Sequence, residues 1–331
     1  MTFLTRLLAS FALVLALSLT APMASAQVNP TQSSVTEDAL FQALGTGPVA
    51  GRTTIPDGNA GYLIKPENKA WAALQGQTLH TLSIVAVVGM LALLTLFYLL
   101  RGKIRVDAGL SGRTILRFNA IERFAHWTLA TTFIILALTG LNLIIGKTVI
   151  MPLIGEAAFG SLSTAGKIAH NYLAWPFMIS VLLIFLLWVV HNLPNKVDLE
   201  WIKQGGGLLK KGVHPPAKKF NAGQKVIFWT VVLGGAALSY TGVMLLFPAD
   251  AGTFADWQFY QTVHALVAAA MSAIVIAHIY IGSVGMEGAF DAMGSGEVDE
   301  NWAKEHHSLW VEEVKGQSAT AKPSAATTPA E

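Results

Sequence analysis

The stretch HALVAAAMSAIVIAH, residues 264–278, places two histidines at the ends of thirteen apolar or small residues. Such a run has the composition of a membrane-spanning helix, in which an ionisable side chain is costly and is a functional candidate by default. Fourteen residues correspond to about 21 Å along a helix axis. Fourteen steps of about 100° end about 40° short of four turns, so both imidazoles face nearly the same side. The sequence therefore predicts one helix that presents histidines at two depths.

The composition of the whole chain is that of a membrane protein. Of its 331 residues, 53% are hydrophobic and only 13% are charged, and the mean hydropathy is +0.51. A soluble domain usually carries about 25% charged residues. The chain has no cysteine, which excludes disulfides, thiolate-held iron–sulfur clusters and covalently attached c-type haem on this chain. A bound metal would need histidine, methionine or oxygen ligands.

Five long apolar runs lie at residues 79–100, 124–146, 168–191, 226–247 and 260–285. Each is long enough to cross a hydrocarbon core of about 30 Å. The segments after the first and third runs carry six and seven Lys or Arg residues, whereas the segment after the fourth carries none. The positive-inside rule assigns the basic segments to the cytoplasm. We therefore expect a multi-pass protein of the bacterial inner membrane, with a periplasmic N-terminus and a cytoplasmic C-terminus.

The N-terminal residues have the pattern of a secretory signal peptide: a basic residue at Arg6, an apolar run, and a small-residue site that ends at Ala26. A retained membrane anchor is the alternative. No internal repeat is visible. The predicted organisation is a signal peptide at 1–26, an exported polar segment at 27–75, an extra transmembrane helix at 76–101, a four-helix domain at 115–290, and a cytoplasmic tail at 291–331 with a disordered end.

The nine histidines fall into two groups. Five lie in loops, in the tail or at the ends of runs, and are interpreted as interfacial or solvated: His80, His191, His214, His306 and His307. The other four fall inside apolar runs, two near the outer surface (His170 and His264) and two near the inner surface (His126 and His278). The topology therefore predicts one histidine pair at each side of the membrane, with about 21 Å between the pairs.

A histidine pair without further ligands suits a six-coordinate haem b in electron transfer. Zinc would need more ligands, and a proton relay usually includes carboxylates; no Asp or Glu lies beside these histidines in the spans. Small residues around the pair leave room for a flat macrocycle, or let helices pack closely, and both can hold. They are Ala265, Ala268, Ala269, Ala270, Ser272, Ala273 and Ala277.

Several separate pieces carry a family resemblance: RFNAIERFAHW, GKIAHNYLAWPF, VVHNLPNKVDLEW, KFNAGQKVIFW, TGV, the 264–278 helix and WAKEHHSLWVEE. In order and spacing they resemble the gamma subunit of membrane-bound formate dehydrogenase, over about residues 115–313. The resemblance implies an all-α membrane protein, a four-helix transmembrane di-haem cytochrome b bundle. Short members of the family begin just before the first piece, whereas this chain is a long form with a signal peptide and one extra transmembrane helix.

The resemblance also implies site residues. In the family, two haems b are held by histidine pairs that correspond to His170 with His264 at the outer side, and to His126 with His278 at the inner side. This is the pairing that the topology gives independently.

A quinone site beside the inner haem is implied as well, near Asn221, Gly223 and His278. Asn221 offers an amide donor and Gly223 allows close approach to a ring. The alternative for Asn221 is a cap on the first turn of a helix.

As function, the resemblance implies an electron relay. A separate catalytic alpha subunit with a molybdenum or tungsten pterin oxidises formate, and an iron–sulfur beta subunit passes the electrons on. This chain, with no formate oxidation site of its own, anchors the complex and carries the electrons through two haems b to reduce quinone. Its partners are then those two subunits, quinone and membrane lipid, and no nucleic acid. Two alternatives remain: a cytochrome b subunit of another quinone-linked enzyme, such as a hydrogenase or thiosulfate reductase, and a haem-free transporter or scaffold.

Overall fold

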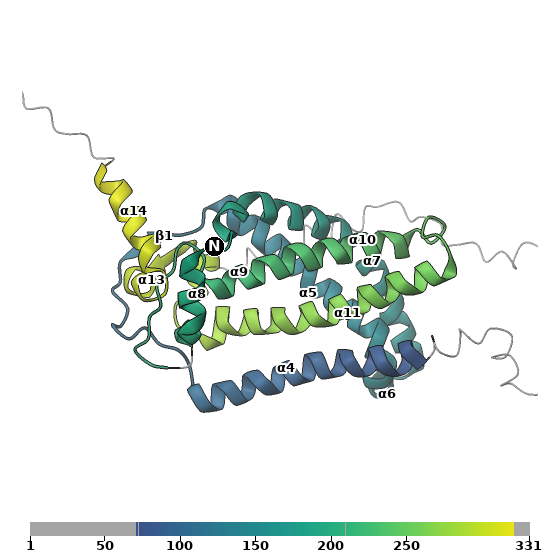
Figure 1. The fold of residues 1–331 in the computed structure, drawn as a ribbon. Helices are drawn as coiled ribbons and strands as arrows, with labels where there is room; N and C mark the ends of the chain where they lie inside the picture. Colours follow the sequence, from purple (N-terminus) through teal and green to yellow (C-terminus); the bar gives the residue numbers. More distant parts are fainter. Residues whose placement is uncertain (1–70, 72, 209, 321–331) are drawn as a thin grey trace, which may run out of the picture. The chain divides into compact units, whose positions relative to one another are not determined.

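The structure is a computed structural model that describes residues 71, 73–208 and 210–320. Figure 1 shows its fold. All helices and strands named below belong to one unit that begins at Leu74. The predicted signal peptide, nearly all of the predicted exported segment and residues 321–331 lie outside the described residues.

Helices make up most of the described chain. The five long helical stretches are η2–α4 (a π-helical turn Leu74–Leu79, then His80–Arg101), α5 (Ala120–Val149), α7 (Glu156–Trp188), α9–η5–α10 (Ala222–Trp229, a π-helical turn Thr230–Gly234, Gly235–Leu246) and α11–η6 (Phe254–Tyr280, a π-helical turn Ile281–Gly285). Each stretch is long and apolar enough to cross a membrane. The fold is therefore the all-α membrane fold predicted from the sequence.

Short elements lie between these stretches and after the last of them. They are β1 (Thr114–Leu116), α6 (Met151–Ile154), η3 (Val190–Asn192), α8 (Lys196–Lys203), η4 (Gly205–Gly207), α12 (Asp291–Gly294), β2 (Glu297–Asp299), α13 (Glu300–His306) and α14 (Ser308–Thr320). The strands β1 and β2 pair antiparallel, with Ile115 opposite Val298. Helix α14 extends to Thr320. It therefore includes the first residues of the segment that the sequence predicts to be a disordered end of the tail.

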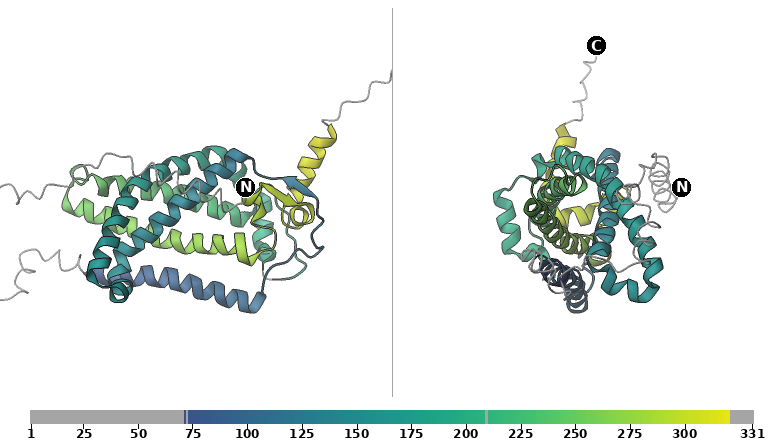
Figure 2. Two further views of the ribbon diagram at one scale, coloured as in Figure 1. Left: turned by 180° about the vertical axis from the view of Figure 1, so that it is seen from behind. Right: turned by 90° about the vertical axis from the view of Figure 1, so that its right-hand side faces the viewer.

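Helix α11 is packed between two neighbours. It runs alongside α10 on one side and α4 on the other, while α5 and α7 pack along each other (Figures 1 and 2). The buried residues of α11 are mostly small, among them Ala265, Ala269 and Ala273, which lets neighbouring helices approach closely. The outward side chains of α4 are exposed leucines and valines, as expected for a surface that faces lipid.

Most helices begin before their apolar runs, because polar residues cap them. In α5, the side chain of Asn119 accepts hydrogen bonds from the first turn, and Glu122 bonds back to the Asn119 N–H. Thr253 and Asp256 form the same capping box at the start of α11. A capping box satisfies N–H groups that would otherwise lack partners at the helix start. Hydropathy alone places the helix boundary several residues too late, because these capping residues are polar.

The largest difference concerns α7. It begins at Glu156, directly after Gly155 with φ +82°, and not near residue 168 as predicted. His170 therefore lies roughly four turns inside the helix and not near its start. The first three turns were missed because their residues are too polar for a membrane-helix pattern, although the hydroxyls of Ser161 and Thr164 bond back to carbonyls four residues earlier within the helix.

A buried arginine, Arg117, lies just before α5, where it contacts residues of the C-terminal segment. Arg117 is 4% exposed and lies over the rings of Phe118, Trp302 and Trp310. Its Nη2 donates to the Lys219 carbonyl at 2.5 Å. Burial lowers the pKa of Arg117 to about 9, and the nearby charge of Glu122 opposes this shift. Arg117 therefore remains a cation at neutral pH.

His307 is fully buried beside this arginine, so the prediction of a solvated side chain was wrong. Its Nε2 lies 3.0 Å from Arg117 Nη2, and its Nδ1 lies 2.8 Å from the Lys218 carbonyl. An arginine can only donate, so Nε2 accepts, Nδ1 carries the proton and the ring is neutral. Burial and the charge of Arg117 hold the pKa of His307 well below its ordinary value of 6.5. Only the folded contacts reveal this role, since the surrounding KEHHSL sequence is polar.

We expect acid to destabilise the protein partly through His307. Below its ordinary pKa of about 6.5, the unfolded histidine binds a proton that the folded one does not, so stability falls as the pH drops. The slope from this residue is at most about 1.4 kcal/mol per pH unit. Thermal unfolding midpoints of the purified protein between pH 7.5 and 5.5 measure it. His307→Gln should weaken the pH dependence, whereas His191→Gln, at an exposed position, should leave it unchanged; equal slopes in wild type and His307→Gln would contradict the assignment.

Candidate functional site

The four histidines of the membrane helices meet in two pairs. His170 of α7 and His264 of α11 have ring centroids 6.3 Å apart. His126 of α5 and His278 of α11 have ring centroids 6.2 Å apart. The structure thus brings together the partners predicted from topology, and α11 contributes one histidine to each pair. All four rings are partly buried.

The ring distances suit a metal held from two opposite sides. An imidazole nitrogen binds a first-row metal at about 2.0–2.1 Å, which places the two nitrogens about 4 Å and the ring centres about 6 Å apart. Within residues 71, 73–208 and 210–320, no group of three or more His, Cys, Asp or Glu is arranged to hold a metal ion. Two imidazoles that face each other in this way suit an iron whose other four ligands come from a porphyrin.

A threonine hydroxyl contacts each histidine of the 170–264 pair. Thr139 Oγ1 of α5 lies 2.8 Å from His170 Nδ1, and Thr241 Oγ1 of α10 lies 2.9 Å from His264 Nδ1. Sequence reasoning did not identify either threonine as a site residue. The available signal was a repeated Thr-Gly dipeptide inside two apolar runs, and an isolated Thr-Gly is too common to carry an assignment.

The glycine of each dipeptide also faces the same ring. A Cβ atom at Gly140 would lie 3.4 Å from His170 Cε1, and one at Gly242 would lie 3.3 Å from His264 Cε1. A Cβ at Gly140 would be in ordinary contact with its ring, whereas one at Gly242 would be tight enough to require a small shift of the imidazole. Each ring therefore lies against a Thr-Gly step of the neighbouring helix, with its Nδ1 on the hydroxyl and its Cε1 on the glycine.

The 126–278 pair has a different environment. Among the described residues, nothing hydrogen-bonds Nδ1 of His126, although the atom is buried. The His126 ring instead meets Trp127 edge-on, with ring centroids 5.3 Å apart. The two pairs thus have similar spacing and different hydrogen bonding.

The predicted quinone residues have local structural roles. Asn221 caps α9: its side chain accepts from the Gln224 N–H, and the Gln224 side chain bonds back to Asn221. This is the capping role that the sequence offered as the alternative. A Cβ at Gly223 would lie 3.0 Å from the Trp201 ring, so this glycine permits close packing of α8 on α9. The structure gives no contact that joins Asn221 or Gly223 to His278 within the described residues.

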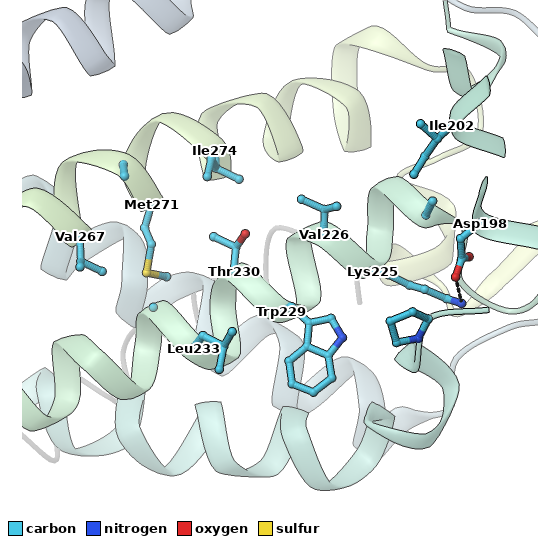
Figure 3. A pocket seen from close by; sticks show the side chains of 14 residues that line it. Asp198, Ile202, Lys225, Val226, Trp229, Thr230, Leu233, Val267, Met271 and Ile274 are labelled. Carbon is cyan, nitrogen blue, oxygen red and sulfur yellow. Dashed lines mark hydrogen bonds and ion pairs between the residues drawn. The ribbon is translucent and has the colours of Figure 1, made fainter. Parts of the chain in front are cut away.

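A groove of about 540 Å³ lies between α9–η5 and α11 (Figure 3). Its sides are apolar. One end holds an ion pair, in which Lys225 Nζ lies 2.9 Å from Asp198 Oδ2. Ala222, the neighbour of Asn221, belongs to its lining. The other lining residues labelled in Figure 3 are Ile202, Val226, Trp229, Thr230, Leu233, Val267, Met271 and Ile274.

Comparison with known families agrees with this site. Residues 117–296, which contain all four paired histidines, match the family model described as prokaryotic cytochrome b561. The chain belongs to this family. It is therefore a multi-pass membrane cytochrome b, which binds haem b and takes part in electron transfer.

Individual relatives agree with the family assignment. The chain is 28% identical over 211 residues to the cytochrome b556(Fdn) subunit of the nitrate-inducible formate dehydrogenase of Escherichia coli K12, a match that covers 62% of this chain and 94% of the relative. It is 29% identical over 205 residues to the cytochrome b556(fdo) subunit of the same organism, with 61% and 94% covered. A Haemophilus influenzae formate dehydrogenase cytochrome b556 subunit is 27% identical over 203 residues, with 60% and 83% covered.

The histidine pairs fit the haem b that the family implies. A six-coordinate haem iron needs two axial ligands from the protein, because the porphyrin supplies the other four. Each pair offers two imidazoles at a suitable spacing.

We expect Gly242→Val in this cytochrome b to reduce haem binding. The valine methyl groups would enter the space of the His264 ring, which a Cβ alone already approaches to 3.3 Å. Haem content per chain, measured by the pyridine haemochrome assay, should fall, whereas Gly282→Val should leave it unchanged because a Cβ at Gly282 meets nothing within 4 Å. Equal haem content in both variants would show that Gly242 is not needed to seat the ring.

Proposed function

We propose that this cytochrome b is the membrane-anchoring subunit of a formate dehydrogenase complex in the bacterial inner membrane. It carries electrons from an iron–sulfur subunit to a quinone, and a separate pterin subunit with molybdenum or tungsten oxidises formate. The support is that the relatives reported above are cytochrome b556 subunits of formate dehydrogenases, and that the chain covers 94% of the length of two of them. The same support favours formate dehydrogenase over a hydrogenase or thiosulfate reductase.

The chain holds two haems b in this proposal. His170 and His264 bind the outer haem, and His126 and His278 bind the inner haem. The observation that carries this assignment is the meeting of four histidines from three helices in two pairs with nearly equal ring distances, 6.3 and 6.2 Å. The haem iron supplies the one-electron redox chemistry.

The remaining residues of the chain hold the ligands and separate the two sites. The apolar helices exclude water from the imidazoles, and α11 sets a spacing of about 21 Å between the two ligands that it carries. The outer pair is assigned to the periplasmic side because the Lys/Arg-rich segments between the spans lie beyond the other end of the helices, and such segments remain in the cytoplasm. The N-terminus is then periplasmic and the C-terminus cytoplasmic.

Quinone is reduced beside the inner haem in this proposal, near Asn221, Gly223 and His278. The apolar groove between α9–η5 and α11 supports this position, because it suits the hydrocarbon tail of a quinone and reaches Ala222 at the start of α9. The ion pair of Lys225 with Asp198 gives that end of the groove a polar boundary.

Single histidine substitutions test the haem assignment. His170→Ala and His264→Ala should each remove the outer haem, and His126→Ala should remove the inner haem, so the pyridine haemochrome value falls from about two haems per chain to about one. His191→Ala, at an exposed position near the end of α7, should retain both haems. A wild-type protein without haem, or loss of haem in His191→Ala, would overturn the assignment.

The quinone position is tested with Asn221→Ser in membranes that hold the whole complex. Serine caps a helix about as well as asparagine, so the fold is kept while the amide donor is lost. Formate should reduce the haem absorbance in wild type and variant alike, but reoxidation by added quinone should slow only in the variant. Asn195→Ser, at the capping box of α8, is the matched control.

Two results would contradict these assignments. Equal reoxidation rates in Asn221→Ser and Asn195→Ser would remove Asn221 from the quinone site. Reduction of the haem signal by hydrogen or thiosulfate, and not by formate, would replace the proposed complex with one of the two alternatives.

A further inference from the structure

Two helical hairpins repeat the same arrangement around a histidine. In the first, α5 presents Thr139 to His170 of α7, and in the second, α10 presents Thr241 to His264 of α11. The first helix of each hairpin supplies a Thr-Gly step, and the second supplies the histidine. The two histidines then meet each other. This repeat concerns only the 170–264 pair.

Hydrogen-bond donation fixes the position of the proton on both rings. The Thr139 hydroxyl lies 2.8 Å from the Ile135 carbonyl and 3.1 Å from the Leu136 carbonyl. A carbonyl can only accept, so the hydroxyl proton points to the backbone. The contact of 2.8 Å with His170 Nδ1 then requires the ring to donate. His170 is therefore protonated at Nδ1, and its Nε2 keeps a free lone pair.

The same assignment holds at the second hairpin. The Thr241 hydroxyl lies 2.7 Å from the Ala237 carbonyl, so it donates there and accepts from His264 Nδ1 at 2.9 Å. Both rings of the pair are thus held as the tautomer whose Nε2 can bind a metal.

We infer that Thr139 and Thr241 are positioning residues that orient the two outer ligands and lower the reduction potential of the haem that they hold. This inference rests on the proposed binding of a haem by His170 and His264. An N–H donated to a fixed acceptor makes the ligating imidazole more basic. A more basic ligand stabilises ferric iron more than ferrous iron, and outer-shell hydrogen bonding is one of the means by which proteins tune haem potentials.

In the inner pair, at least one ring lacks such a hydrogen bond, because no described residue accepts from Nδ1 of His126. The two haems therefore have ligands of similar type and spacing but unequal hydrogen bonding. The inferred consequence is that the outer haem has a lower potential than it would have without the threonine hydroxyls.

Valine variants of the intact chain test the inference. Thr139→Val and Thr241→Val keep the shape of the side chain and remove the hydroxyl acceptor, so that each ring retains only its backbone partner, Leu136 or Leu238. Thr139→Ser and Thr241→Ser keep the hydroxyl. The control is Thr132→Val: Thr132 lies seven residues before Thr139 on α5, is 2% exposed and bonds back to the Thr128 carbonyl at 2.8 Å. None of its hydrogen bonds in the described structure reaches a histidine.

The readout is the midpoint potential of the outer haem, measured alone in a His126→Ala background by optical redox titration. Each valine variant should raise this potential by up to about 59 mV. For one electron, this corresponds to a tenfold change in the ratio of reduced to oxidised haem. The serine variants should stay near the wild-type value, and Thr132→Val should not move it. Loss of the outer haem in a valine variant, with retention in the matching serine variant, also supports a positioning role.

Other outcomes overturn the inference. An unchanged potential in both valine variants would do so, as would an equal shift in Thr132→Val or a serine variant that behaves like valine. Failure of the proposed function is a different result: the wild-type chain would then contain no haem at this pair, and no potential could be measured in any variant.

Discussion

A histidine inside a membrane helix has two ring nitrogens to satisfy where water is absent, and the packing of the helices depends on this constraint. In the 170–264 pair, each Nδ1 donates to a threonine of the preceding span. A buried polar group without a partner would cost about 1–3 kcal/mol. The hydroxyl that accepts from the ring must itself be satisfied, and it donates to a carbonyl of its own helix. The threonine, together with a direct backbone contact of the ring at Leu136 or Leu238, satisfies Nδ1 and leaves Nε2 for a metal.

This constraint makes the first two and the last two core spans into equivalent hairpins. In the 170–264 pair, each ring contacts a threonine and a glycine of the adjacent helix, which ties the axial register of α5 to α7 and of α10 to α11. Helix α11 has a second requirement, because its other histidine must meet His126 of α5. The buried alanines of α11 allow the helices packed against it to approach closely enough for these contacts. Helix α4 contributes to neither histidine pair; its His80 Nε2 instead lies 3.1 Å from Thr148 Oγ1 of α5.

Sequence patterns predicted the five spans and the partners in each pair, because hydropathy, loop charge and a fourteen-residue spacing are all local properties. They misplaced the start of α7, since the first turns of this helix are stabilised by backbone hydrogen bonds and carry too few apolar residues to be recognised by hydropathy. They also missed Thr139 and Thr241, because a threonine in an apolar run is common, and its partner lies 31 or 23 residues away. His307 was misread for the same reason: its partner Arg117 lies 190 positions earlier in the chain.

The unequal hydrogen bonding of the two pairs has an energetic meaning in the proposed orientation. An electron that moves from the outer haem to the inner haem travels toward the negative side of the membrane. The cost of a full crossing is about 2.3 kcal/mol per 100 mV. The pairs are separated by about 21 Å of a core of about 30 Å, so this step would cost roughly 1.6 kcal/mol per 100 mV. A lower potential at the outer haem opposes that cost. In the proposed arrangement, the threonine hydroxyls would act at the position where a stabilised ferric state helps electrons to cross against the field.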